Sequence, residues 1–251
     1  MTRTTSGRRN GRLRRGSLTP GAIVTESLRL LDTEGADGFS LPKLGRALGA
    51  DPTAVYRHFS SKDDLVLAIA DRLIEEAMTG FVAHECWVDT ITDTTRRVCA
   101  TYRAHPAAAA LSASRTTQRP AEMRIVNALI GAVIQAGFTG AAAARMYRAL
   151  GDFTLAWAGS EAAFLALDPG QQEADMSAWT RAYLAVDKTE HPHIWQIRDE
   201  LAGVTGDDIF ETILGLVVRG FMAEAPRPCE CGKHAAAGSD PGELTPSEQT
   251  S

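Results

Sequence analysis

A short run of side chains at residues 51–62, within the stretch "GADPTAVYRHFSSKDDL", has the chemistry of a contact with DNA bases. A hydroxyl such as that of Thr53 can hydrogen-bond a base edge, and the methyl of Ala54 can meet a thymine methyl group. The guanidinium of Arg57 matches the two acceptors of guanine. We therefore expect these three residues to read bases, with a merely solvated surface position as the alternative for Arg57.

Phosphate contacts are expected from neighbouring polar side chains. Tyr56 and His58 suit phosphates, although either ring could instead pack between helices. Lys62 lies where a helix is expected to begin, and backbone N–H groups there also favour anions; an ordinary surface charge is its alternative. Six more residues, at expected helix starts or in the basic N-terminal stretch, complete the predicted DNA-binding set: Arg12, Arg14, Arg15, Thr19, Ser40 and Lys43.

Short helices must position these side chains. Apolar spacing predicts four helices near the N-terminus, over residues 20–33, 40–48, 51–59 and 61 to about 78. Thr19 and Asp51 are expected N-caps, and Ser61 with Asp64 has the spacing of a capping box. Gly49 permits the backbone of a tight turn between the second and third helices. A short helix, a tight turn and a second short helix, supported by a helix on either side, form a helix-turn-helix.

The charge of the chain is unevenly distributed. The 251 residues carry a net charge of −5, yet residues 1–70 hold 11 Lys or Arg and 7 Asp or Glu, a net +4. The remainder holds 15 and 24, a net −9. Six arginines fall within residues 1–16, which predicts a flexible basic arm, unless it is only a solubilising tail. The split indicates a basic module attached to an acidic one.

The rest of the chain is also expected to be helical. Seven further helices are predicted, over residues 88–104, 107–113, 121–136, 139–166, 172–186, 192–202 and 207–224. The uncharged run 125–144 has the length of a membrane span, but Asn127, Gln135 and "GFTG" indicate two helices meeting at a turn. With neither a signal peptide nor a span, the protein is expected to be cytoplasmic and to have no membrane partner.

The sequence carries little that indicates catalysis or metal binding. It contains no nucleophile elbow, no phosphate-binding glycine loop and no HExxH, so no catalytic residue is predicted. Cys229, Cys231 and His234 in "CECGKH" offer three metal ligands, but a fourth is missing nearby and the segment has a disordered composition. We therefore predict no metal site and no cofactor.

At this point the order of features resembles the tetracycline-repressor (TetR) family of bacterial transcriptional regulators. The stretch "LGADPTAVYRHFSSKDDL" is similar to that family's recognition helix and the start of its next helix. A weaker likeness continues through Trp87, "QAGFTGAAAARMYRALGDFTLAW" and the apolar last helix, so that residues 19–224 are covered. One departure lies in "AAAALSAS", where Ser112 stands near the position of a histidine that helps tetracycline repressors hold a magnesium-bound drug. A metal-chelated tetracycline is therefore not expected as the ligand.

The resemblance implies an all-α chain that dimerises and responds to a small ligand. The expected domains are an arginine-rich arm (1–18), a three-helix helix-turn-helix DNA-binding domain (19–66), a larger helical ligand-binding and dimerisation domain (67–225) and a disordered tail (226–251). Apolar and polar side chains within residues 87–165 are the candidate ligand-binding set: Val98, Tyr102, His105, Met123, Asn127, Leu129, Tyr147 and Trp157. Each has an ordinary core position as its alternative.

A homodimer interface is expected along residues 139–166 and 207–224. Both helices are apolar beyond a single stripe, so each must be buried on two sides, and a second copy is the simplest partner. The candidate interface residues are Phe153, Phe164, Phe210, Leu214, Val217 and Phe221.

Together these features predict a ligand-responsive repressor that leaves double-stranded, palindromic operator DNA when a small effector binds. Control by a protein partner is the first alternative, and a helical enzyme with a DNA-binding head is a remote one. An open cavity would favour a small ligand, whereas a sealed core would favour a protein partner.

Overall fold

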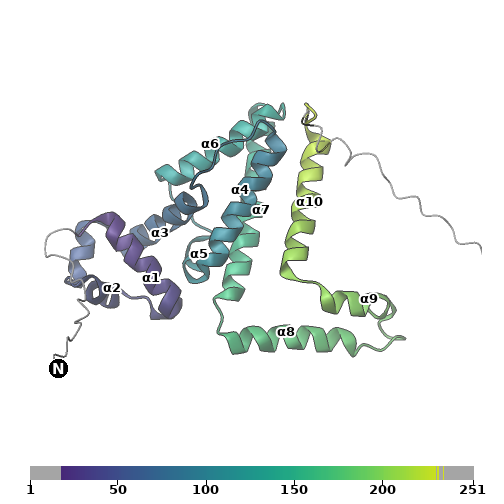
Figure 1. Ribbon diagram of the computed structural model, residues 1–251, viewed down its shortest axis with the longest axis horizontal. Coiled ribbons are helices and arrows are strands. Elements are labelled where there is room, and N and C mark those ends of the chain that lie inside the picture. Colours follow the sequence, from purple (N-terminus) through teal and green to yellow (C-terminus); the bar gives the residue numbers. More distant parts are fainter. Residues whose placement is uncertain (1–17, 230, 232–233, 235–251) are drawn as a thin grey trace, which may run out of the picture.

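The computed structural model describes residues 18–229, 231 and 234, and every regular element among them is helical (Figure 1). This confirms the predicted all-α class. The elements follow the chain in the order α1 (Pro20–Gly38), α2 (Leu41–Leu48), η1 (Pro52–Arg57), α3 (Lys62–Ala77), α4 (Trp87–Ala104), α5 (Pro106–Ser112), α6 (Pro120–Gln135), α7 (Gly140–Leu165), α8 (Pro169–Leu184), α9 (Pro192–Gly203) and α10 (Gly206–Glu224).

Local capping explains where the first helices begin. The Thr19 hydroxyl accepts the Ala22 N–H, and the Asp51 carboxylate accepts the Thr53 N–H, so both predicted N-caps are confirmed. Ser61 caps α3 as predicted by accepting the Asp64 N–H. The Asp64 carboxylate in turn accepts the N–H of Ser60, one residue before the cap.

The helix-turn-helix is held together by a small apolar core. Leu44 and Leu48 of α2 are buried. Val55 of η1 and Phe59, which follows η1, are buried with them. They pack in one cluster with side chains of α1, including Ile23, Leu28 and Leu31. Gly49 ends α2 in a left-handed conformation with φ 62°, which makes the turn into η1.

Two N-terminal elements differ from the prediction. The first helix passes its expected end near residue 33 and reaches Gly38, with a kink at Gly35, where φ is 70°. Glycine tolerates this conformation, so a further helical turn follows the expected stop. The third element is a short 3₁₀-helix, Pro52–Arg57, that ends before the expected Phe59.

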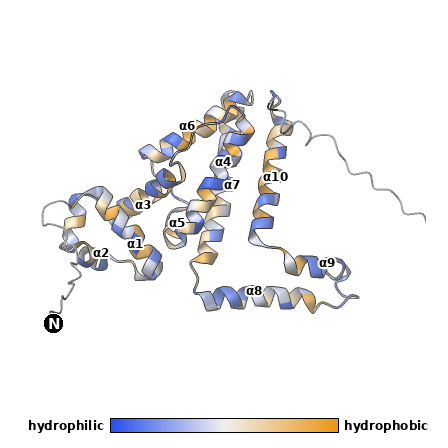
Figure 2. Ribbon diagram, in the orientation of Figure 1, coloured by the Kyte–Doolittle hydropathy of each residue, from blue (hydrophilic) through white to orange (hydrophobic). Residues whose placement is uncertain are grey.

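The body of the molecule consists of α4, α5, α6 and α7, with α3 entering it from the helix-turn-helix end (Figure 1). Helix α10 runs alongside and touches α4. The ring of Trp157 on α7 lies 6.0 Å from that of Phe210, and Phe138 lies 6.5 Å from Phe221. Figure 2 shows hydrophobic residues interspersed with hydrophilic ones along α6 and α10.

Helices α8 and α9 form an extension that begins at the end of α7 and leads back to α10 (Figure 1). They pack against each other, and neither contains a buried residue. Among the described residues, no helix is both long and apolar enough to cross a membrane.

The ends of the chain fall mostly outside the described residues. This applies to the predicted arm, including Arg12, Arg14 and Arg15, and to most of the predicted disordered tail. Within the described part of that tail, the N–H of Arg227 donates to the carbonyl of Ala136 at 2.9 Å.

Candidate functional site

The exposed side of η1 presents the side chains predicted to read bases. Arg57 and His58 are exposed, and Tyr56 is 52% exposed rather than packed between helices. The Thr53 hydroxyl donates to Asp51 at 2.6 Å, which leaves its oxygen lone pairs directed elsewhere as acceptors. Ala54 is half-buried. The structure therefore groups these residues on one short element that is supported from behind by Val55.

The predicted phosphate contacts lie around this element. Lys62 is exposed at the start of α3, with its ammonium 5.9 Å above the ring centre of Phe39. Ser40 caps α2 and accepts the Lys43 N–H. The Lys43 ammonium is bound to Glu34 at 2.6 Å, so it must leave that carboxylate before it can pair with a phosphate.

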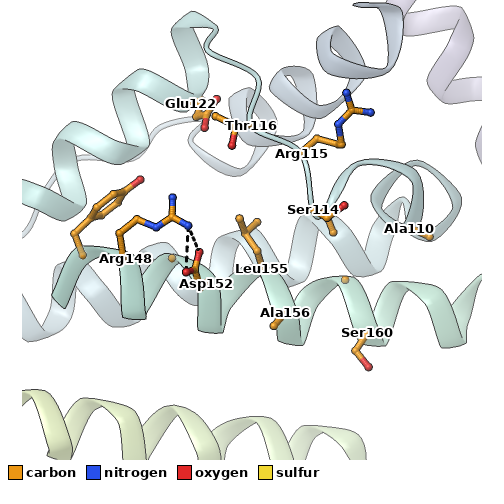
Figure 3. A pocket seen from close by; sticks show the side chains of 14 residues that line it. Ala110, Ser114, Arg115, Thr116, Glu122, Arg148, Asp152, Leu155, Ala156 and Ser160 are labelled. Atoms are coloured by element: carbon orange, nitrogen blue, oxygen red, sulfur yellow. Dashed lines mark hydrogen bonds and ion pairs between the residues drawn. The ribbon is translucent and has the colours of Figure 1, made fainter. Parts of the chain in front are cut away.

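A cavity opens in the body between α4, α6 and α7, with α3 at its inner wall. Its inner part holds about 80 Å³ and is lined by apolar side chains and threonine hydroxyls, including Val98, Tyr102 and Thr154. Its mouth holds about 510 Å³ and is more polar. Figure 3 shows Arg148, Asp152 and Leu155 rising from α7 toward the segment that carries Arg115 and Thr116. The two parts share five lining residues: Arg115, Glu122, Tyr147, Gly151 and Leu155.

Half of the predicted ligand-binding residues line this cavity, namely Val98, Tyr102, Leu129 and Tyr147. Burial raises the pKa of the Tyr102 hydroxyl to about 12, so that group stays protonated. Burial and the nearby Glu122 also raise the pKa of Tyr147.

The other four predicted ligand-binding residues do not line the cavity. His105 pairs with Asp32 at 3.0 Å and with Glu76 at 3.3 Å. Met123 and Asn127 are exposed on α6, because their helical phase turns them away from α4. Trp157 packs against Phe210, on the α10 side of α7. Ser112, which stands near the position of the family's drug-binding histidine, is buried and donates to the Ala108 carbonyl at 2.8 Å.

Three carboxylates of α3 bind the segment between α5 and α6 and the first turn of α6, where Arg115 and Glu122 line the cavity. Asp63 forms a bidentate pair with Arg115, at 2.6 and 2.7 Å, and Asp64 pairs with Arg119. Asp71 accepts the N–H of Glu122 at the first turn of α6. The guanidinium of Arg115 lowers the pKa of the Asp63 carboxyl, which keeps the pair ionised near neutral pH.

Sequence reasoning missed these ties. The sequence marks Asp64 only as part of a predicted capping box, and Arg115 lies 52 residues from its partner Asp63. The available signal was two arginines in an otherwise uncharged segment between helices, "SASRTTQRP".

None of the six predicted dimer residues is exposed in the single chain. Phe210, Leu214 and Phe221 are buried against the chain's own body, whereas Phe153, Phe164 and Val217 are half-buried. The side of α10 that faces away from the body presents Leu216, which is 57% exposed, and Ile209.

Comparisons with known proteins cover both parts of the chain. Residues 23–69 match the model of bacterial regulatory proteins of the tetR family, and residues 83–225 match the tetracyclin repressor-like C-terminal domain.

Curated relatives support the same assignment. An HTH-type transcriptional repressor of Mycobacterium tuberculosis is 31% identical over 124 residues, which is 49% of this chain and 47% of the relative. The class A tetracycline repressor from transposon 1721 of Escherichia coli is 27% identical over 140 residues, covering 55% and 64%. The match thus spans about half the length of the first of these relatives. Both are regulators, in agreement with the prediction that this chain is not an enzyme.

Solved structures share the fold over a greater length. A TetR regulator of Streptomyces coelicolor is 26% identical with a TM-score of 0.69, covering 83% of this chain and all of that one. The S. coelicolor TetR family protein ActR in complex with actinorhodin has a TM-score of 0.72 at 21% identity, covering 84% and 98%. From the matches to both its halves, this chain belongs to the TetR family and is a helix-turn-helix transcriptional regulator.

Proposed function

We propose that this chain is a repressor that binds palindromic operator DNA as a homodimer and leaves it when a small molecule enters the cavity. The observation that carries the proposal is the position of Arg115, which lines the cavity while holding Asp63 on the first turn of α3. Lys62, the residue before Asp63, is a predicted phosphate contact. A ligand that displaces Arg115 would therefore act on the helix start next to the recognition element.

The cavity supports a small ligand over a protein partner as the effector. Its mouth and inner part together reach the size of typical small-molecule sites, and its lining combines apolar walls with a few polar groups. Arg115 and Arg148 at the mouth are balanced by Glu122 and Asp152, whereas Val98 and Leu129 make the inner wall apolar. We expect a mainly apolar molecule that carries a hydrogen-bonding edge.

The change in DNA affinity follows from geometry. A two-fold dimer places two recognition elements in successive major grooves about 34–36 Å apart, and a ligand that favours another spacing lowers affinity. A coupling free energy of about 1–3 kcal/mol changes affinity about 5–150-fold. Helix α3 is the element that connects η1 to the cavity, so it is the expected lever.

The test is a footprint of the full chain on DNA flanking its own coding region, with and without compounds that raise its melting temperature. We expect protection of an inverted repeat and its loss with an active compound. The Arg115→Ala variant should still bind DNA but respond less to saturating compound.

Arg148→Ala is the matched control, because the partner of Arg148, Asp152, lies within the same helix α7. This variant should shift the compound concentration required and keep the full response at saturation. Full release of Arg115→Ala at saturation would contradict the role of Arg115. Absence of any protected inverted repeat would contradict the repressor itself.

A further inference from the structure

Three cysteines and a histidine from distant parts of the chain meet at the end of the body where α4 begins. The Cys86 Sγ lies 2.8 Å from the Cys229 Sγ, which lies 2.9 Å from the Cys231 Sγ. The ligand atoms of Cys86, Cys231 and His234 all lie within 4.8 Å of one another. None of these residues belongs to the DNA-binding surface or to the ligand cavity.

We propose that Cys86, Cys229, Cys231 and His234 form a structural zinc site that fastens the segment after α10 to the first turn of α4. Three thiolates and one imidazole are a known complete ligand set for tetrahedral Zn²⁺, and four protein ligands leave no open position for catalysis. At metal–ligand distances of about 2.0–2.3 Å, ligand atoms in such a site are about 3–4 Å apart. Cys86, Cys231 and His234 lie close to this scale from one another, whereas Cys229, at 2.8 and 2.9 Å from its two sulfur neighbours, would move away from them to take the fourth position.

The surroundings suit thiolate ligands. Cys86 is the N-cap residue of α4 and its side chain makes no capping bond, so its sulfur lies at the positive end of the helix dipole. Arg227 and Glu85 line the same hollow of about 410 Å³ as the three cysteines, so their opposite charges balance there. The helix dipole therefore offsets part of the net negative charge of three thiolates around one divalent ion.

The histidine is oriented by a carboxylate, as metal-bound histidines usually are. The Nε2 of His234 lies 3.0 Å from the Oδ1 of Asp89 on the first turn of α4. When Nε2 donates to this carboxylate, the lone pair that can bind a metal lies on Nδ1. Asp89 therefore acts as a positioning residue for the imidazole.

The segment that carries these ligands is fixed independently of any metal. The N–H of Arg227 donates to the Ala136 carbonyl at 2.9 Å, and Pro226 and Arg227 lie against Gly137, where a Cβ would come within 3.0 Å of both. The backbone is thus already turned toward α4 when it reaches Cys229. This removes the objection raised by the sequence, because Cys86, 143 residues before Cys229, supplies the missing fourth ligand.

The experiment uses the full chain, freed of metal by a chelator and kept reduced, and titrated with Co²⁺ and then Zn²⁺. We expect one Co²⁺ per chain, with the intense visible bands of a tetrahedral ion and the ultraviolet charge-transfer band of thiolate ligation, and displacement by Zn²⁺. Cys229→Ser and Cys231→Ser carry the test because both positions lie beyond α10. Each should lower affinity at least about 10-fold, and Asp89→Asn should lower it about 10–100-fold.

Cys99→Ser is the matched control, since Cys99 is a buried thiol on the same helix α4 and outside the cluster. Its metal titration should equal that of the wild type. Three results would overturn the proposal: no uptake of Co²⁺ by the reduced chain, an uptake spectrum without the thiolate band, or unchanged affinity in Cys231→Ser.

Discussion

The side chains on and after η1 include predicted base contacts, among them Arg57, and predicted contacts to the DNA backbone. Arg57 is an exposed long donor at the end of this element, whereas Lys62 lies at the adjacent helix start. We expect Arg57→Ala to cost about 1–3 kcal/mol on the cognate operator and to relax preference at one base pair per half-site. The measurement is fluorescence anisotropy on a set of single-base operator variants.

Lys62→Ala is the companion variant. It should weaken binding to all sequences alike and reduce the salt dependence, because it removes a phosphate contact. If Arg57→Ala also lowers affinity equally for every sequence, Arg57 contacts the backbone and the predicted base contact is wrong.

Gly45 is the residue where the helix-turn-helix tolerates no side chain. A Cβ there would lie 2.9 Å from the nitrogen of Pro52 and 3.0 Å from the carbonyl oxygen of Ala50, both of them backbone atoms. We expect Gly45→Ala to push η1 away from α2, to destabilise the N-terminal unit by about 1–3 kcal/mol and to weaken operator binding. Thermal unfolding and anisotropy together measure both effects.

Gly131→Ala on α6 serves as the control for this prediction, because nothing lies within 4 Å of the added Cβ. Alanine is the better helix former, so this variant should be equally stable or more stable by about 0.5–1 kcal/mol. If Gly45→Ala matches Gly131→Ala in stability and operator binding, the turn between α2 and η1 can move to accommodate the added Cβ.

At the scale of elements, the ion pairs of one histidine join α1 and α3 to the junction of α4 and α5. His105, between α4 and α5, pairs with Asp32 of α1 and Glu76 of α3. Partial burial lowers its pKa, but the two carboxylates outweigh this effect and raise the pKa above its ordinary value. The two ion pairs are therefore strongest when the imidazole is protonated.

The sign of the pH effect follows from this shift. A folded-state pKa above the unfolded value of about 6.5 gives stability that is complete below about pH 6.5 and is lost as pH rises through the folded-state pKa. We expect His105→Gln to lower the free energy of unfolding more at low pH than at high pH, as measured by urea denaturation across this range. His193→Gln, an exposed histidine on α9, should leave the pH profile unchanged. A parallel downward shift of the whole His105→Gln profile would exclude this mechanism.

At the scale of the whole molecule, α10 uses one side for the chain's own core and leaves the other open. Leu214 is 2% exposed and Leu216 is 57% exposed, although only one residue separates them. We expect Leu216→Glu to convert a dimer to a monomer and to abolish tight operator binding, with helical content unchanged. Sedimentation velocity at micromolar concentration and circular dichroism test this.

Leu214→Glu is the contrasting variant. It buries a charge without a partner, so it should unfold the body rather than merely separate subunits. A wild-type chain that sediments as a monomer and still binds a two-half-site operator tightly would refute the dimer interface on α10.

Much of the local structure was determined by the sequence alone. Helical periodicity located the helices from α4 to α10 to within a few residues, and Thr19, Asp51 and Ser61 marked helix starts, because these signals act over three or four residues of chain. The helix-turn-helix and its exposed residues followed for the same reason. The resemblance to the TetR family also rested on short sequence motifs.

Only the tertiary structure decided which distant side chains meet. Periodicity shows that a residue lies on an apolar stripe but not which neighbour covers it, so Met123 and Trp157 were expected at the cavity and lie outside its lining, while Leu214 faces the core. The Asp63–Arg115 pair and the Cys86–Cys229 contact join residues 52 and 143 positions apart. Such contacts depend on how helices cross, and no local spacing in the sequence encodes that crossing.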